Sequence, residues 1–296
     1  AIRASFSARP NFLIAASRRS ASELDTLVNG ALGNLSFFCE VHEDAEDRER
    51  LRPMFVMGSS ALDEEVPWAA HLAEEVLRET DFSDIERIRD ILGQRRIAME
   101  QAFASAGHSA AMARVASYYL PAGVVREALS GVGFYRFLKE LLASFDERAC
   151  ELSAKLAELS RRLFTDGGCT LSFGGDEAAL AAFREASSPL GGMAGAPALT
   201  VPAPEDGHEA FVVASDVTYT ACGWDRRLLG EPYGGAWLLA SRILSYDFLW
   251  TEVRVKGGAY GAGFQTTRSG SSRFYSYRDP RIDETVERFR TSGDWL

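Results

Sequence analysis

The apolar residues of this chain follow two different spacings, and the change between them predicts where strands give way to helices. Aromatic and β-favouring residues fill positions 34–42 and 53–59, which flank an acidic stretch and predict a hairpin. Beyond Asp63, the expected cap of the first helix, apolar residues recur at helical spacing. We therefore expect a hairpin followed by a group of helices.

A second helix start is indicated by the spacing of Ser83 and Glu86. This is the form of a capping box, in which the serine hydroxyl accepts a hydrogen bond from a backbone N–H and the glutamate reaches back. The helix is predicted to run to about Ala106. The elements expected after it are helices at 108–119, 133–143 and 146–163, a strand at 170–173, and a helix capped by Asp176.

The periodic pattern breaks in a segment rich in glycine and proline. We interpret residues 187–208 as a linker between a first domain, residues 1–186, and a second domain, residues 209–296. The alternative is a long surface loop within a single domain.

The second domain repeats the order of strands and helices. Strands are expected at 210–215 and 217–224, then a helix opened by Pro232 whose wide apolar face predicts burial. Two more strands, GFQTT and SRFYSY, and a last helix capped by Asp279 follow. Segregated runs of strands and helices predict an α+β fold rather than a doubly wound α/β fold.

Composition narrows the class of protein. The chain has 296 residues, of which 46% are apolar, enough for two domains with sizeable cores. A net charge of −10 argues against nucleic-acid binding, and no apolar run of about 18 residues predicts a membrane span. Arginine far outnumbers lysine, which is typical of a GC-rich bacterial genome and favours a bacterial cytoplasm. The first residues do not read as a signal peptide, so we expect the chain to begin inside a longer protein.

The sequence offers no convincing metal site. Its four cysteines form no CxxC pair, so we expect small buried residues in a reducing compartment. His71, Glu74 and Glu75 form a degenerate version of the inverted zinc motif His-x-x-Glu-His, and we interpret them as a solvated helix face. The other histidines, His42, His108 and His208, are expected to be structural.

The stretch RVKGGAYGAGF, residues 254–264, places Arg254 and Tyr260 among small residues. Its glycines are in the wrong order for a dinucleotide fingerprint. Glycines let another backbone approach closely, a guanidinium donates to carbonyls or carboxylates, and a phenol is a neutral donor at pH 7. These groups suit an extended peptide. A β-bulge with a packed tyrosine and a surface arginine is the alternative.

At this point the chain resembles a known family. The runs that carry the resemblance are LWTEVRVKGGAYGAG, FYSYRDP, DETVERF, RPMFVMGSSAL, FSDIERIRDILGQ, GHSAAMAR and SGVGFY. They are similar to the C-terminal half of pitrilysin-type zinc metallopeptidases, in particular to the presequence protease and falcilysin branch. The resemblance spans most of the chain and is weakest over residues 1–30.

The resemblance implies a clamshell of four related α+β domains, each with an antiparallel-rich sheet covered by helices. This chain corresponds to the third domain and a truncated fourth. The family's zinc is bound by the N-terminal half, which is absent here, so no cofactor is expected on this chain and the chain alone is expected to be inactive. Its partners would be a peptide substrate and that N-terminal half.

The resemblance also implies roles for individual residues. Arg254 and Tyr260 would contact the bound peptide, and Gly257, Gly258, Ala259 and Gly261 would let the peptide lie along a strand edge. A non-catalytic scaffold or peptide-binding subunit of the same fold remains the alternative.

Overall fold

The computed structural model describes residues 19–164, 170–187 and 201–296. The chain forms two compact units, and neither is a single stretch of sequence. Unit 1 comprises residues 1–39, 55–94 and 140–198, and unit 2 comprises residues 40–54, 95–139 and 199–296. The boundary between them therefore falls inside several of the helices and strands. The predicted division at residues 187–208, most of which lie outside the described ranges, stays a prediction.

Unit 1 is built mainly from helices around two small cores. The helices are α1 (Ala21–Ala31), the short turn η2 (Asp63–Glu65), α2 (Val66–Glu79), the start of α3 (Ile85–Ala116), α6 (Phe145–Leu163) and α7 (Glu177–Ala186). Leu24 and Val28 of α1 pack with Leu72 of α2 in one core. In the other core, Ile88 of α3 packs with Phe145 of α6.

The predicted hairpin is confirmed. Strands β1 (Asn34–Glu43) and β2 (Leu51–Ser60) form a two-stranded sheet, and the acidic stretch makes the turn between them. The carboxylate of Asp44 shapes this turn by accepting hydrogen bonds from the backbone N–H groups of Glu46 and Asp47. These bonds also hold the pKa of Asp44 below its usual value.

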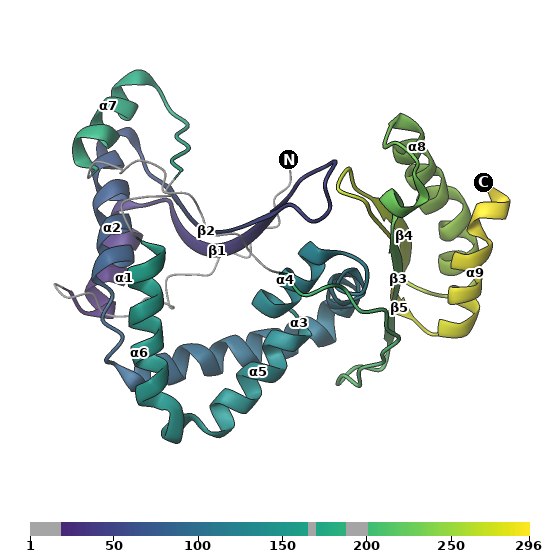
Figure 1. Ribbon diagram of the computed structural model, residues 1–296, viewed down its shortest axis with the longest axis horizontal. Helices are drawn as coiled ribbons and strands as arrows, with labels where there is room; N and C mark the ends of the chain where they lie inside the picture. The colour runs from purple at the N-terminus through teal and green to yellow at the C-terminus, as the bar shows by residue number, and fades with distance from the viewer. Residues whose placement is uncertain (1–18, 165–169, 188–200) are drawn as a thin grey trace. The chain divides into compact units, whose positions relative to one another are not determined.

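Unit 2 contains a three-stranded antiparallel sheet in the order β3–β5–β4. The strands are β3 (Thr218–Asp225), β4 (Gly261–Thr266) and β5 (Ser271–Asp279), and in their register Gly263 lies opposite Tyr275. Helices cover one face of the sheet: α8 (Gly235–Ile243), its π-helical continuations η4 (Leu244–Phe248) and η5 (Trp250–Lys256), and α9 (Ile282–Trp295). Figure 1 shows α8 and α9 on this side of the sheet.

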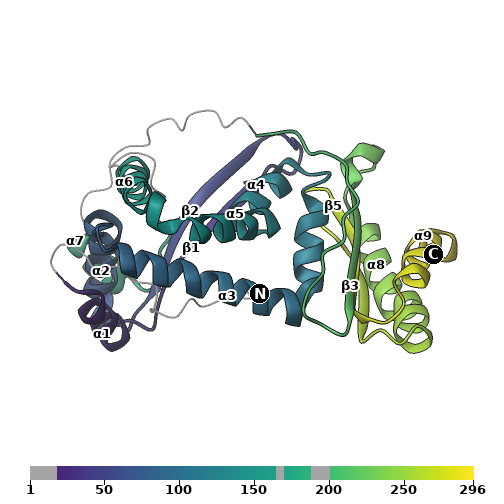
Figure 2. The ribbon, with the colours of Figure 1, turned by 90° about the horizontal axis from the view of Figure 1, so that it is seen from below.

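The two faces of the sheet use alternate residues of the strands. Phe264 and Phe274, whose ring centroids are 4.6 Å apart, join Phe289 of α9 in the core beneath the helices. On the opposite face, the hydroxyls of Tyr219 and Tyr277 donate to carbonyls in the part of α3 that belongs to unit 2. Figure 2 shows that part of α3 beside β3 and β5.

These tyrosines meet α3 at a kink. Ala106 has φ −138° and ψ 40°, outside the helical range, at the residue where the sequence predicted the helix to end. Tyr219 donates to the carbonyl of Ala104, and Tyr277 donates to that of Ser105, so both bonds reach the helix just before the kink. The helices α4 (Pro121–Ser130), which the sequence pattern did not predict, and α5 (Val132–Ala143) follow α3.

Several local predictions are wrong for identifiable reasons. Residues 170–173 and 210–215 form no strand with any described part of the chain. Asp84, not Ser83, caps α3: it accepts from the backbone N–H of Arg87, while the Ser83 hydroxyl donates to Asp81. Neither Asp63 nor Asp279 makes the expected side-chain cap of its helix.

The expected burial of the cysteines is also wrong for two of them. Cys39 lies on β1 and Cys150 on α6, and both are exposed. Cys222 of β3 is half-buried, as its place in the sheet of unit 2 requires. Cys169 lies outside the described residues.

The helix expected from Pro232 differs from its prediction as well. It begins at Gly235 and becomes π-helical from Leu244. Its apolar face is only partly buried, since Leu249 is fully buried whereas Leu239 is 61% exposed. The capping of α7 by Asp176, in contrast, is confirmed by its hydrogen bond from the backbone N–H of Ala179.

Candidate functional site

The candidate site lies where η5 ends and β4 begins, in unit 2. Residues 257–260 make the connection between the two elements. Beneath it, Val253 and Ala259 are buried in the core that also holds Phe264. The connection is thus anchored by apolar side chains, and Tyr260 beyond them stays at the surface.

Gly258 ends the helix. Its φ is +85°, in the left-handed region that residues with a Cβ seldom adopt, and its N–H donates to the carbonyl of Arg254. This is the αL motif that commonly closes a helix, with glycine at the position after the cap. The N–H of Ala259 then donates to the carbonyl of Val253, which directs the chain into β4.

Arg254 lies between two aromatic rings. Its guanidinium carbon Cζ is 3.8 Å from the ring centroid of Trp250 and 5.7 Å from that of Tyr260. A guanidinium over an aromatic face is attracted by the negative charge of the ring's π-cloud. The structure therefore brings Arg254 and Tyr260 together, the two residues that the sequence singled out as a pair.

Tyr260 is held by its backbone while its side chain is exposed. The backbone N–H donates to the carbonyls of Tyr277 and Arg278 on β5, at 3.0 and 3.2 Å. The ring meets that of Tyr277 edge-on, at 5.6 Å, and the residue is 66% exposed. The phenol is thus fixed at its root and open to solvent at its hydroxyl.

The polar groups of both side chains are unengaged within the described ranges. No hydrogen bond or ion pair there involves the Arg254 guanidinium or the Tyr260 hydroxyl. The nearest acid in sequence, Glu252, pairs instead with Lys256 at 2.6 Å and with Arg288 at 3.6 Å. The hydrogen bond from Lys256 lowers the pKa of Glu252, so its charge is committed away from Arg254.

The small residues of the stretch have several roles. Gly257 directly follows η5, and Gly261 opens β4 with only Tyr277 within 4.0 Å of where a Cβ would lie. The methyl of Ala259 lies in the core, so only its backbone can face a ligand. Open space around a missing side chain is thus a property of Gly261 in particular.

β4 is an edge strand of the sheet, because its one described strand neighbour is β5. Part of its outer edge is closed by side chains of the covering helix. The N–H of Phe264 donates to Oγ of Ser245, and its carbonyl accepts from the hydroxyls of Ser241 and Ser245. Any pairing with an added strand is therefore confined to the start of β4, next to Tyr260.

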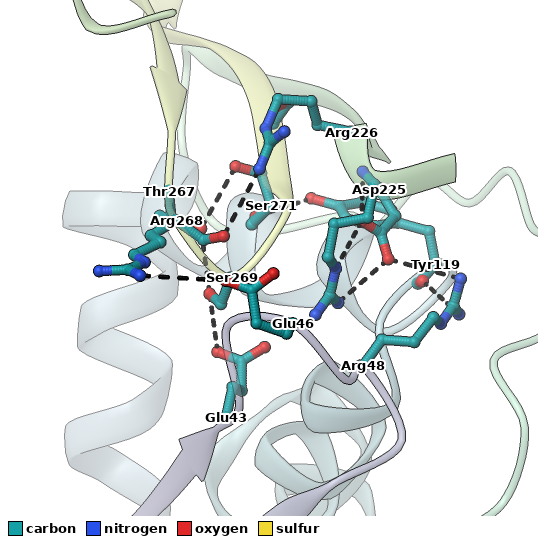
Figure 3. Close-up of polar contacts among 12 residues, drawn as sticks. Glu43, Glu46, Arg48, Tyr119, Asp225, Arg226, Thr267, Arg268, Ser269 and Ser271 are labelled. Atoms are coloured by element: carbon teal, nitrogen blue, oxygen red, sulfur yellow. Dashed lines mark hydrogen bonds and ion pairs between the residues drawn. The ribbon is translucent and has the colours of Figure 1, made fainter. Parts of the chain in front are cut away.

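A polar network holds the opposite end of the β4–β5 hairpin (Figure 3). Buried Asp225 accepts hydrogen bonds from Arg227, and it lies 3.4 Å from Arg48 in the turn between β1 and β2. In the hairpin turn, Ser271 meets the hydroxyl of Tyr119, which lies just beyond α3. These contacts fix the hairpin at the end away from Tyr260.

The site contains one residue that the sequence analysis did not single out. Trp250 covers one face of Arg254, and its position four residues earlier on a predicted helix was the available signal, because such pairs share a helix face.

The described residues do not fit a zinc ion. No group of three or more histidines, cysteines or acids in them is placed to hold a metal. Of the degenerate motif, Glu75 is paired with Arg19, and His71 meets the ring of Trp68. We therefore derive no metal-dependent step for this chain. No helix in the described ranges is both long and apolar enough to cross a membrane.

Comparison with known proteins places both parts of the chain. A family model for the region associated with peptidases of the C subgroup of the pitrilysin family matches residues 14–141. A second model, described as "PreP C-terminal domain", matches residues 208–296. The second match includes the whole candidate site.

Individual relatives agree with these matches. Protein HypA of Clostridium perfringens is 29% identical over 93% of the chain, which covers 28% of that protein. Presequence protease 1 of Arabidopsis thaliana, described as chloroplastic/mitochondrial, is 30% identical over 75% of the chain and 21% of its own length. The mitochondrial presequence protease of Yarrowia lipolytica is 29% identical over 81% of the chain and 25% of its own length. The chain thus spans about a quarter of the length of these relatives.

Proposed function

Because the chain belongs to the pitrilysin peptidase family, as a presequence protease-like C-terminal region, we propose that it is the substrate-contacting half of a zinc metalloendopeptidase. The zinc would be held by an N-terminal half, on the same or a separate chain. The full protein would degrade peptides and unfolded segments. The observation that carries this proposal is the adjacent pair of unengaged donors, Arg254 and Tyr260, beside an edge strand.

The proposed work of this chain is to bind and orient an extended peptide. Backbone groups at the start of β4, where Gly261 leaves space, would pair with the peptide as an added strand. The Arg254 guanidinium would hold a peptide carbonyl or carboxylate through planar N–H donors. The peptide would thereby lie alongside the exposed phenol.

Tyr260 would act on the reacting carbonyl. Its hydroxyl would donate a hydrogen bond to the oxygen on which negative charge develops as the peptide bond is attacked. A donor placed for that oxygen stabilises the transition state more than the ground state. Closure of this half over the substrate would exclude water and complete the site.

Replacement of one hydroxyl tests the proposal. In the full-length protein, Tyr260→Phe should lower the turnover of a quenched fluorescent peptide by about 10²- to 10³-fold. The melting temperature should barely change, because the hydroxyl makes no hydrogen bond to a described residue. Tyr246→Phe is the matched control, since Tyr246 is equally exposed at 66% on the covering helix. Near-normal turnover of Tyr260→Phe would refute the assigned role, and peptide binding without turnover in the wild type would favour a non-catalytic binding subunit.

We also propose a location in a bacterial cytoplasm, which the arginine-rich composition and the clostridial relative support. The relatives named presequence protease are mitochondrial or chloroplastic. Fractionation of the source organism, followed by detection of the protein in the cytoplasmic or another fraction, tests this location.

A further inference from the structure

We propose that Trp250 is a positioning residue for Arg254, and that it fixes the direction in which this guanidinium presents its N–H donors to a peptide. The inference rests on the proposed function. It begins from the distance of 3.8 Å between the Arg254 Cζ atom and the Trp250 ring centroid. The other arginine–aromatic pairs of the described chain are more open, from 4.8 Å for Arg89 and Phe145 upwards.

The backbone beneath the pair is firmly packed. Leu249, the neighbour of Trp250, is 0% exposed, and Val253, the neighbour of Arg254, is 1% exposed. Both belong to the core of unit 2. The helix therefore presents Trp250 and Arg254 together at the surface from a backbone that the core holds in place.

Burial does not explain the position of the Trp250 side chain. Trp250 is 43% exposed, and a packing role would normally place so large an apolar side chain inside. Its indole contributes to the surface mainly as a platform for the guanidinium. The Tyr260 ring lies 5.7 Å from the same guanidinium carbon, so Trp250 is the closer of its two aromatic neighbours.

Stacking has a consequence for recognition. An arginine side chain is flexible, and a guanidinium that stacks on a ring by its face keeps its edge, with the N–H donors, free. No carboxylate among the described residues occupies that edge, and Glu252 is drawn to Lys256 and Arg288. The oriented edge fits a planar acceptor on the substrate, a peptide carbonyl or a carboxylate. Loss of the ring would leave the charge in place but not its direction.

A double-mutant cycle in the full-length protein tests this role. The variants are Trp250→Leu, Arg254→Ala and the pair, measured with a quenched fluorescent peptide for kcat and KM and by fluorescence anisotropy for peptide binding. Trp250→Leu alone should lower kcat/KM by about threefold to thirtyfold, the range expected for a partly exposed cation–π contact. In the Arg254→Ala background it should change kcat/KM by less than about twofold, because a residue that acts through Arg254 has nothing left to position. Trp250→Phe, which keeps an aromatic face, should restore part of the loss.

The chain supplies a matched control. Arg242 and Tyr246 form a similar pair on the covering helix, with the guanidinium carbon 5.9 Å from the ring and outside the candidate site. Tyr246→Leu should leave kcat/KM unchanged, and melting temperatures should be alike for all variants that are compared.

The outcomes separate the two proposals. If Arg254→Ala leaves kcat/KM unchanged, the proposed function of Arg254 fails, and the role of Trp250 fails with it. If Arg254→Ala impairs the enzyme but Trp250→Leu does not, only the positioning role is refuted. Equal losses from Trp250→Leu in both backgrounds would also refute it, because the ring would then act independently of Arg254.

Discussion

The buried carboxylate of Asp225 at the end of β3 lies 3.4 Å from the guanidinium of Arg48 in the turn between β1 and β2. Arg227 donates to the same carboxylate through its own guanidinium. Within unit 2, one acid thus ties together two segments that are distant in sequence. A buried charge is costly unless it is paired, so this acid and its arginines depend on each other.

Asp225→Asn should therefore destabilise the protein. The amide removes the negative charge and leaves two arginines without their partner, and we expect a loss of about 3 kcal/mol in the free energy of unfolding. Urea unfolding followed by circular dichroism measures it. Glu46→Gln is the control, because the Glu46–Arg268 pair is exposed and 3.9 Å long, and it should change the free energy of unfolding by under about 0.5 kcal/mol. An equal effect of both substitutions would contradict the role of burial.

Gly258 should not tolerate a side chain, because its φ of +85° is the conformation that closes the helix before Tyr260. Gly258→Ala should lower the free energy of unfolding by about 1–2 kcal/mol. Gly93 lies within α3 with nothing inside 4 Å of an added methyl, so Gly93→Ala should raise it by about 0.5–1 kcal/mol. Thermal unfolding of both variants checks for shifts of opposite sign, and a tolerated Gly258→Ala would contradict the turn assignment.

The local parts of the fold were predictable from the sequence, and the parts that depend on distant partners were not. The hairpin of β1 and β2 and the cap at Asp176 follow from short-range pattern. Residues 210–215 have strand composition, yet Val212 is fully exposed, since a strand also needs a neighbour that its own sequence does not reveal.

The candidate site divides in the same way. Arg254 and Tyr260 were predicted from residue types and from resemblance, and the left-handed Gly258 agrees with the general rule that glycine at a helix end permits a turn. The serine caps on the edge of β4 and the pairing of Asp225 with Arg48 required coordinates, because the segments involved come together only through tertiary packing.

Ser245 should matter more than Ser241 at that strand edge. The N–H of buried Phe264 donates to the Ser245 hydroxyl, whereas the Phe264 carbonyl accepts from both serines. Ser245→Ala should cost about 1–3 kcal/mol, the penalty for an unsatisfied buried group, and Ser241→Ala about 1 kcal/mol or less. Hydrogen exchange of the Phe264 amide should accelerate in Ser245→Ala only. Equal protection in both variants would mean that the serine hydroxyl does not hold this amide.

The segment that leads into β3 should give the protein an acid-sensitive stability. Hydrogen bonds from Arg114, and next from Tyr118, lower the pKa of Glu209 from 4.5 to about 2. Because the folded protein binds this proton less readily than the unfolded chain, the stabilisation is complete above about pH 5 and is lost as the pH falls towards 2.

Since about a third of the Glu209 side chain is exposed, solvent screening limits the contribution to about 1–2 kcal/mol. Glu209→Gln should thus be less stable than wild type at pH 7, and the gap should close as the pH is lowered to 3. Urea unfolding at several pH values measures both proteins, and Glu205→Gln, at an exposed position of the same segment, should match wild type throughout. A gap between Glu209→Gln and wild type that stays constant from pH 7 to 3 would assign the loss to packing rather than to the charge of Glu209.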